Sequence, residues 1–110
     1  MDDQAVGPEL VLSTERDGDT AVVSVRGELD AYSAPGLEEQ VTRLTDADVN
    51  AVVLDLSGTV FLDSSGLRAI LTVQRRLQER KGHMALRTPS EPVTRLLEIT
   101  GLTEHFTIES

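Results

Sequence analysis

Apolar and polar residues alternate along the chain with two different periods, and the pattern predicts strands and helices in turn. Two short aliphatic segments, 10–12 and 20–25, flank a polar turn at 17–19. Such segments joined by a short polar turn are typical of a β-hairpin. The later segment 51–56 is almost continuously apolar. This pattern predicts a central strand that is covered on both faces.

Amphipathic spacing predicts one helix after the hairpin and a second helix in the middle of the chain. Ser33 can cap the first helix, and Pro35 lies in its first turn, where a missing N–H costs nothing. The second helix follows a short apolar run, 60–62, and begins at 63–66. Its apolar residues fall on one face, and Gly82 ends it. We expect both helices to pack on the sheet.

The last third of the chain predicts a strand at 84–86, a third helix and a final extended segment at 102–108. Ser90 and Pro92 open the third helix, and Gly101 ends it. The order of elements favours an α/β fold, in which helices pack on a mixed β-sheet in a single layered domain.

Composition is consistent with one domain spanning residues 1–110, with its core at about 10–108. A chain of 110 residues with 39% hydrophobic residues, three aromatic residues and no cysteine can build one aliphatic core without disulfides. No apolar run approaches the roughly 20 residues of a membrane helix. The N-terminus is acidic and is not a secretory signal. We therefore expect a cytoplasmic protein with no membrane association.

The net charge of −9 is unevenly distributed. Residues 1–50 carry 12 acidic and 3 basic side chains, whereas residues 51–110 carry 7 of each. A negative field repels the phosphate backbone of nucleic acid, although a merely soluble acidic surface would have the same charge. The glycines form neither of the familiar phosphate-binding loops, so we expect no nucleotide or other cofactor bound by the chain itself.

The most informative local segment runs from Asp63 to Gly66 and has more than one interpretation. Asp63 or Ser64 can act as the N-cap of the second helix. Gly66 would let another molecule approach the backbone closely. A serine hydroxyl at an exposed helix start is also suited to accept a phosphoryl group, because the dianion would meet the positive end of the helix dipole.

A hydrolase is the enzymatic interpretation of the same segment. Ser64 would be the nucleophile of a strand-to-helix elbow and His105 its base, but Leu62 stands where the elbow needs a glycine. The other histidine, His83, is 22 positions from His105, which is not metal-ligand spacing. We expect both histidines to be surface or half-buried side chains.

Three segments resemble the signatures of one protein family. They are Gly-Glu-Leu-Asp-Ala-Tyr-Ser-Ala-Pro at 27–35, Phe-Leu-Asp-Ser-Ser-Gly-Leu at 61–67 and Ile-Thr-Gly-Leu at 99–102. In this order and spacing they resemble bacterial anti-sigma factor antagonists, which are single STAS domains. The likeness extends over residues 10–108, so the resemblance implies a STAS-like fold for nearly the whole chain.

The resemblance implies a regulatory protein, not an enzyme. In this family the unmodified antagonist binds an anti-sigma factor that is itself a serine kinase, and so frees a sigma factor for transcription. Phosphorylation of the antagonist releases the anti-sigma factor, and a metal-dependent serine phosphatase resets the switch. ATP and magnesium would be held by the kinase. We expect a monomer or weak dimer.

Residue by residue, the resemblance places the phosphorylation site at Ser64, with the adjacent Ser65 as the less favoured hydroxyl. In the family that the chain resembles, close relatives usually have glycine at the position that Arg68 occupies here. Arg68 can pair with a phosphate on Ser64, contact a partner, or be an ordinary exposed arginine. We expect the partner-binding surface to comprise Glu28, Asp30, Ser33, Asp63, Ser65, Gly66 and Arg68.

An alternative function remains for the same domain. It could serve as a scaffold or regulatory module in a stress-sensing assembly or a transporter-associated complex. Scaffold proteins would elute from a sizing column as large complexes, whereas an antagonist would not.

Overall fold

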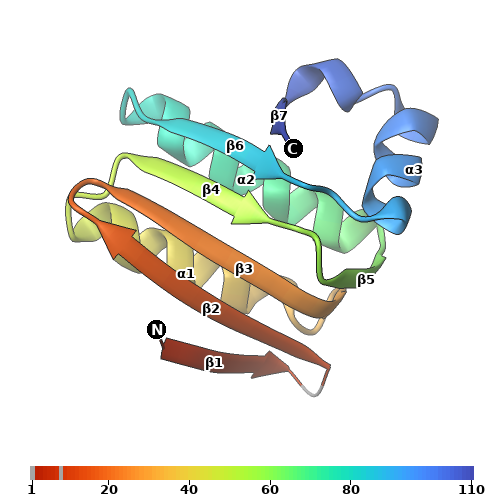
Figure 1. Ribbon diagram of the computed structural model, residues 1–110, viewed down its shortest axis with the longest axis horizontal. Coiled ribbons are helices and arrows are strands. Elements are labelled where there is room, and N and C mark those ends of the chain that lie inside the picture. Colours follow the sequence, from red (N-terminus) through yellow and green to blue (C-terminus); the bar gives the residue numbers. More distant parts are fainter. Residues whose placement is uncertain (1, 8) are drawn as a thin grey trace.

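A mixed sheet of seven strands forms the centre of the computed structural model, which describes residues 2–7 and 9–110 (Figure 1). The strands are β1 (Asp2–Gly7), β2 (Leu10–Asp17), β3 (Thr20–Leu29), β4 (Ala51–Asp55), β5 (Thr59–Leu62), β6 (His83–Arg87) and β7 (Thr107–Glu109). The helices are α1 (Ala34–Asp46), α2 (Ser64–Glu79), α3 (Glu91–Thr100) and the short 3-10 helix η1 (Thr103–His105).

The strand order is β1-β2-β3-β4-β6-β7, with β5 paired beside β3. Strands β1, β2 and β3 are antiparallel, and β3, β4, β6 and β7 are parallel. Strand β3 is long enough to pair twice: its first half pairs with β4 and its second half with β5, both in parallel. The carboxyl ends of β3 and β5 therefore meet at one edge of the sheet, where Leu29 pairs with Leu62.

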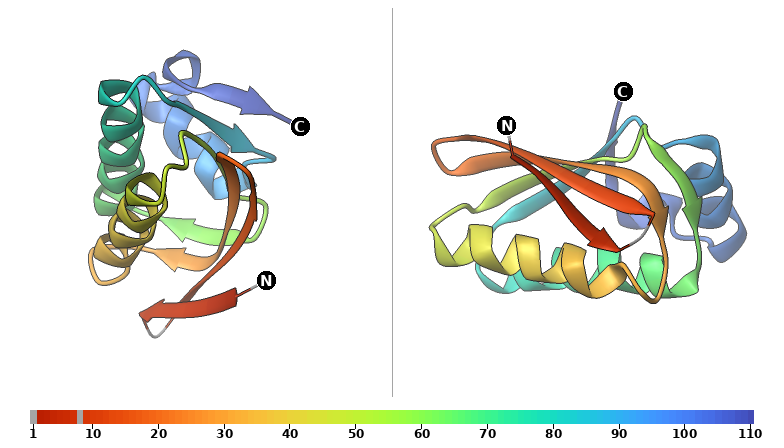
Figure 2. Two further views of the ribbon diagram at one scale, coloured as in Figure 1. Left: turned by 90° about the vertical axis from the view of Figure 1, so that its left-hand side faces the viewer. Right: turned by 90° about the horizontal axis from the view of Figure 1, so that it is seen from below.

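Helices α1 and α2 lie side by side on one face of the sheet, and α3 packs near its end against β5 (Figure 2). The core beneath them is aliphatic, and Phe106 is the only one of the three aromatic residues that is buried. In β4, Val52 and Leu54 are buried, whereas Ala51 and Val53 are half-buried. The expectation that this strand is covered on both faces is therefore wrong for one face.

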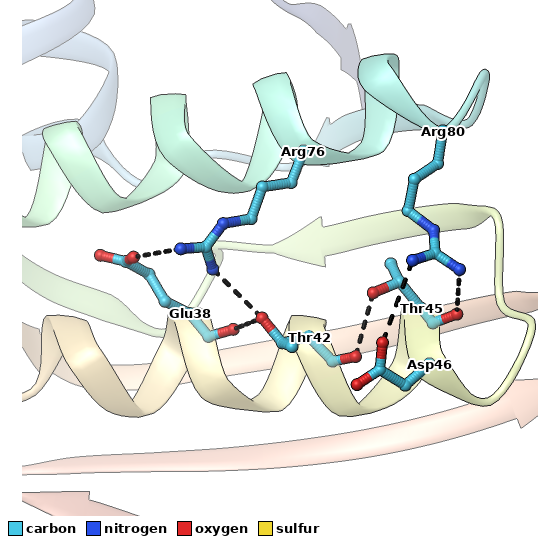
Figure 3. Close-up of polar contacts among 6 residues, drawn as sticks. All are labelled: Glu38, Thr42, Thr45, Asp46, Arg76 and Arg80. Atoms are coloured by element: carbon cyan, nitrogen blue, oxygen red, sulfur yellow. Dashed lines mark hydrogen bonds and ion pairs between the residues drawn. The ribbon is translucent and has the colours of Figure 1, made fainter.

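Arg76 of α2 and Arg80, directly after it, reach across to α1 (Figure 3). The Arg76 guanidinium donates to the Thr42 hydroxyl at 3.1 Å and lies 3.5 Å from the Glu38 carboxylate. The Arg80 guanidinium donates to the Thr45 carbonyl oxygen at 2.9 Å. These contacts orient the two helices, although exposed pairs of this kind contribute little to stability.

Most of the predicted elements are confirmed. The hairpin, the three helices and the strands at 51–56 and 84–86 are present. Strand β1 was not predicted, because its acidic sequence has a low β propensity and it forms by pairing with β2. The segment 102–108 is not extended throughout, since η1 interrupts it before β7 pairs with β6. Within the described residues, no helix is both long and apolar enough to cross a membrane.

Candidate functional site at the start of helix α2

The candidate site lies where two loops leave the same edge of the sheet. Because Leu29 and Leu62 are paired at the ends of β3 and β5, the residues that follow them are neighbours in space. The backbone N–H of Asp63 donates to the Leu29 carbonyl oxygen at 3.4 Å. The topology thus places Asp30, which follows β3, beside the start of α2.

Asp63 is the N-cap of α2. Its backbone is extended, and its side-chain Oδ1 accepts the N–H of Gly66 at 2.9 Å. Its carbonyl oxygen accepts the N–H of Leu67 at 3.0 Å, which begins the helical hydrogen bonding. Of the two cap candidates in the sequence, Asp63 has the role, and Ser64 becomes the first residue of the helix.

Gly66 is a glycine for a different reason than the sequence suggested. It is buried in the first turn of α2. A Cβ at this position would lie 2.6 Å from the Leu62 Cδ1 and closer still to the Leu29 carbonyl oxygen. The molecule that approaches the Gly66 backbone is therefore the chain's own strand β3, and the glycine allows α2 to pack onto the end of the sheet.

Ser64 is exposed at the tip of this arrangement. Its hydroxyl makes no hydrogen bond to any residue that the structure describes. The Asp63 carboxylate accepts the free Gly66 N–H at the helix start instead. Ser65 is half-buried beside it. Ser64 thus has an unengaged hydroxyl at the positive end of a helix of 16 residues.

The loop after β3 is held by a closed set of hydrogen bonds around Asp30. Its Oδ1 accepts the backbone N–H groups of Tyr32 at 3.0 Å and Ser33 at 3.1 Å. The Ser33 hydroxyl donates to the Glu28 carbonyl oxygen at 2.9 Å and accepts the N–H of Asp30 at 3.0 Å. Tyr32 projects from this loop with 85% of its surface exposed.

The prediction that Ser33 caps α1 is wrong. Ser33 occupies the cap position, but its side chain makes no capping hydrogen bond and points back to the strand. Only 2% of its surface is exposed. As an expected partner-binding residue, Ser33 can act only by shaping the loop that carries Asp30.

The fold and the geometry of this site agree with the family resemblance seen in the sequence. The model of the STAS domain matches residues 11–110. The chain belongs to the STAS domain family. The sheet with helices on one face confirms the expected STAS-like fold.

Several proteins that are similar to this chain are named anti-sigma factor antagonists. The anti-sigma-B factor antagonist of Listeria monocytogenes is 32% identical over 96 residues, which is 87% of this chain and 84% of that protein. The solved structure of an anti-sigma factor antagonist from Mycobacterium paratuberculosis is 28% identical, with a TM-score of 0.80, and covers 96% of this chain and 90% of its own. The Bacillus cell fate determinant SpoIIAA in its phosphorylated form is 22% identical, with a TM-score of 0.73 and 90% coverage of each chain, and shares the fold.

The hydrolase interpretation does not fit the geometry of this STAS domain. The carbonyl oxygen of His105 accepts a hydrogen bond from Gln74, which places His105 beside the third turn of α2. Gln74 is ten residues after Ser64, or about 15 Å along the helix at about 1.5 Å per residue. His105 is therefore too far from Ser64 to act as its base.

Two further features of the STAS domain were not predicted from its sequence. His83 and His105, distant in sequence, line one polar cavity of about 220 Å³ between β6, η1 and α2. An apolar groove of about 380 Å³ lies between β5 and α3, where Phe61 and Ile99 are 47% and 74% exposed. Phe61 lies in β5, the strand that directly precedes the start of α2. The sequence shows that a residue such as Ile99 is apolar, but it does not show whether another element covers that residue.

Proposed function

We propose that this STAS domain is an anti-sigma factor antagonist whose partner binding is switched by phosphorylation of Ser64. Its unmodified form binds an anti-sigma factor that is a serine kinase, and a sigma factor is freed as a result. The names of its relatives support the antagonist function. The exposed Ser64 hydroxyl, which has no hydrogen-bond partner among the described residues, is the observation that supports phosphorylation at this residue.

The chemistry of the switch is a phosphoryl transfer. The Ser64 oxygen attacks the terminal phosphorus of ATP held by the kinase, ADP leaves, and the serine proton is lost to the kinase's base. A metal-dependent serine phosphatase hydrolyses the ester and returns inorganic phosphate and the free hydroxyl. The STAS domain supplies only the serine, so it acts as a substrate of both enzymes.

Electrostatics explains why the modified form would release its partner. A phosphate adds roughly −1.5 to −2 charge at a position that already has Asp63 directly before it and Asp30 on the adjacent loop. Contacts between cationic groups of the partner and Asp30 or Glu28 would persist. Anionic groups of the partner near Ser64 would be repelled by the phosphate. Like charges at a docked interface cost several kcal/mol, and about 1.4 kcal/mol already changes an equilibrium tenfold.

The phosphorylated helix is expected to stay folded. The N-terminus of α2 stabilises negative charge, and Asp63 keeps its bond to Gly66 because Ser64 takes no part in the cap. The switch therefore changes a surface charge and leaves the fold intact, so the released protein remains ready for dephosphorylation.

The test combines phosphorylation with binding. The purified chain is incubated with candidate anti-sigma factor kinases and magnesium ATP, and the modified residue is located by mass spectrometry of a peptide spanning 62–75. We expect phosphate on Ser64, none on the Ser64→Ala variant, and normal modification of the Ser65→Ala variant. Phosphate on Ser65 alone would overturn the site.

Binding of the same kinases is then measured by titration. We expect Ser64→Ala to bind as the unmodified protein does and Ser64→Asp to bind at least about tenfold more weakly. Equal affinity of these two variants would contradict the charge mechanism. A monomer or weak dimer on a sizing column would agree with an antagonist in the cytoplasm, whereas a large complex would favour the scaffold function.

A further inference from the structure

Helix α2 carries an unusual concentration of positive charge for so acidic a chain. Five of the ten basic residues lie in or directly after it, at positions 68, 75, 76, 80 and 81, whereas the net charge of the whole chain is −9. The only acidic residue between 64 and 81 is Glu79. The surface of α2 is thus a local cationic region within a negative protein.

The four arginines in α2 and directly after it fall into two pairs with different environments. Arg76 and Arg80 point to α1 and are engaged there by oxygen atoms, as Figure 3 shows. Arg68 and Arg75 are exposed. Neither makes a hydrogen bond or an ion pair with any residue that the structure describes. The first pair bridges α2 and α1, and the second pair faces outward.

Helical periodicity places Arg68 and Arg75 on the same face as Ser64. With about 3.6 residues per turn, positions four and eleven residues after Ser64 project in nearly the same direction. Leu71 lies between the two arginines and is only partly buried against the core. Ser64, Arg68, Leu71 and Arg75 therefore form a continuous line on the outer face of α2, about 16 Å long at about 1.5 Å per residue.

We propose that Arg68, Leu71 and Arg75 form a docking strip for an acidic segment of the anti-sigma factor. The proposal rests on the proposed function, because a kinase that modifies Ser64 must approach the face of α2 that carries it. Two cations about 10 Å apart, with an apolar side chain between them, complement a helix that presents two carboxylates around an apolar residue.

The strip also gives the interface a direction. Acidic groups lie at the helix start on Asp63, on the neighbouring loop at Asp30 and near the end of β3 at Glu28. Cationic groups follow along the helix. A partner with the opposite order of charges matches this surface in one orientation and is repelled in the reverse one. Ser64 lies at the junction, where an added dianion changes the sign of the field that the acidic segment meets.

Charge-reversal variants test the strip. In titrations at low salt, we expect Arg68→Glu and Arg75→Glu each to weaken binding of the anti-sigma factor at least about tenfold, and Arg75→Lys to retain most of the affinity. The control is Lys81→Glu, which changes the charge by the same amount at an exposed residue beyond the end of α2. Because all three positions are exposed, the unfolding midpoints of the variants should match that of the wild type.

The outcomes separate this proposal from the proposed function. If the wild type binds the anti-sigma factor and Arg75→Glu binds equally well, the strip is only a solvated surface and the proposal is overturned. Equal weakening by Lys81→Glu would also overturn it, because net charge alone would then explain the effect. If neither the wild type nor Ser64→Ala binds an anti-sigma factor, the proposed function itself is contradicted.

A second measurement does not depend on the anti-sigma factor. The full chain, labelled with ¹⁵N, is titrated with a synthetic amphipathic helix that carries glutamates seven residues apart around leucine. We expect chemical-shift changes at Arg68, Leu71 and Arg75, which disappear in Arg75→Glu and persist in Lys81→Glu. Shift changes spread over all basic residues, or none at all, would contradict the strip.

Discussion

Helices α1 and α2 begin at the same edge of the sheet, after strands that are paired with each other. The serines at these two helix starts nevertheless differ in burial and in hydrogen bonding. Ser33, before α1, is buried, and its hydroxyl both donates and accepts hydrogen bonds. Ser64, at the start of α2, is exposed, and its hydroxyl makes no hydrogen bond to the described residues. The residue type is the same, but only one of the two is available for modification.

The position of the nearest aspartate explains the difference. Asp30 lies three residues before Ser33, so the aspartate turns the chain and the serine can reach back to the strand. Asp63 lies directly before Ser64, takes the N-cap position itself and moves the serine into the helix, where its side chain points outward. Ser90, before α3, resembles Ser33, since its hydroxyl donates to the Thr59 carbonyl oxygen of β5.

The largest expected effect concerns the packing that presents Ser64. Gly66→Ala places a methyl group against the Leu29 carbonyl oxygen and the Leu62 side chain, both of which are fixed by strand pairing. We expect the free energy of unfolding to fall by about 2 to 3 kcal/mol, measured by urea denaturation.

Gly58→Ala is the matched control for this substitution. The added methyl group there meets the Cγ of Arg26 at 2.8 Å, and a flexible, exposed side chain can move aside. We expect a loss well below that of Gly66→Ala. Similar losses in the two variants would show that Gly66 is not held by the backbone of β3.

The second prediction tests whether the α1 serine is structural. Ser33→Ala leaves the Glu28 carbonyl oxygen and the Asp30 N–H without their shared partner in a buried position. We expect the free energy of unfolding to fall by about 1 to 2 kcal/mol. An unchanged midpoint would mean that water replaces the hydroxyl and that the contrast with Ser64 is one of exposure only.

The third prediction concerns the aspartate that displaces Ser64. Asp63→Ala removes the acceptor for the Gly66 N–H and should cost about 1 kcal/mol. Asp63→Asn keeps an oxygen in the same place and should lose less. If both variants are as stable as the wild type, Ser64 or solvent caps the helix equally well, and the aspartate does not determine the serine's position.

The sequence predicted the start of α2 better than the start of α1. The spacing Asp63-Ser64-Ser65-Gly66 indicated both the helix start and the candidate serine, and the structure places them together. Ser33 with Pro35 indicated a helix start correctly, but the role of the serine was wrong because it depends on a strand carbonyl that only the fold brings within reach.

Contacts between distant segments explain what else the sequence missed. Strand β1 forms from an acidic segment because β2 offers a free edge, and the shared cavity of His83 and His105 exists because β7 returns beside β6. The reason for Gly66 likewise lies in Leu29, 37 positions earlier in the chain. Local propensity carries no information on such contacts.

The fourth prediction extends the comparison to a third serine. Ser13 is buried, and its hydroxyl donates to the Asp3 carboxylate at 2.5 Å and accepts from Arg26 at 2.8 Å. The Ser13 hydrogen bond, with help from the Arg26 charge 3.3 Å away, lowers the pKa of Asp3 from its ordinary value of 3.8, and partial desolvation opposes the shift. This favours the carboxylate in the folded state.

The sign of the pH dependence follows. A lowered pKa in the folded state contributes stability that is present above pH 3.8 and is lost as the pH falls through the folded pKa. We expect Asp3→Asn to be slightly less stable than the wild type at pH 7, and the difference to shrink below pH 3.8. The effect is small because Asp3 is exposed, and a difference that grows in acid would contradict it.

The smallest expected effect is also the one on which the comparison depends most. Ser64→Ala removes a hydroxyl that makes no hydrogen bond to a described residue, from an exposed position at which alanine is a good helix former. The free energy of unfolding should change by less than about 0.5 kcal/mol, measured beside Ser33→Ala under the same conditions. If Ser64→Ala costs as much as Ser33→Ala, both serines are structural, and a loss of partner binding in Ser64 variants would report a damaged helix start. If it costs nothing, any change in binding caused by Ser64→Asp comes from its charge, because the fold does not depend on the hydroxyl.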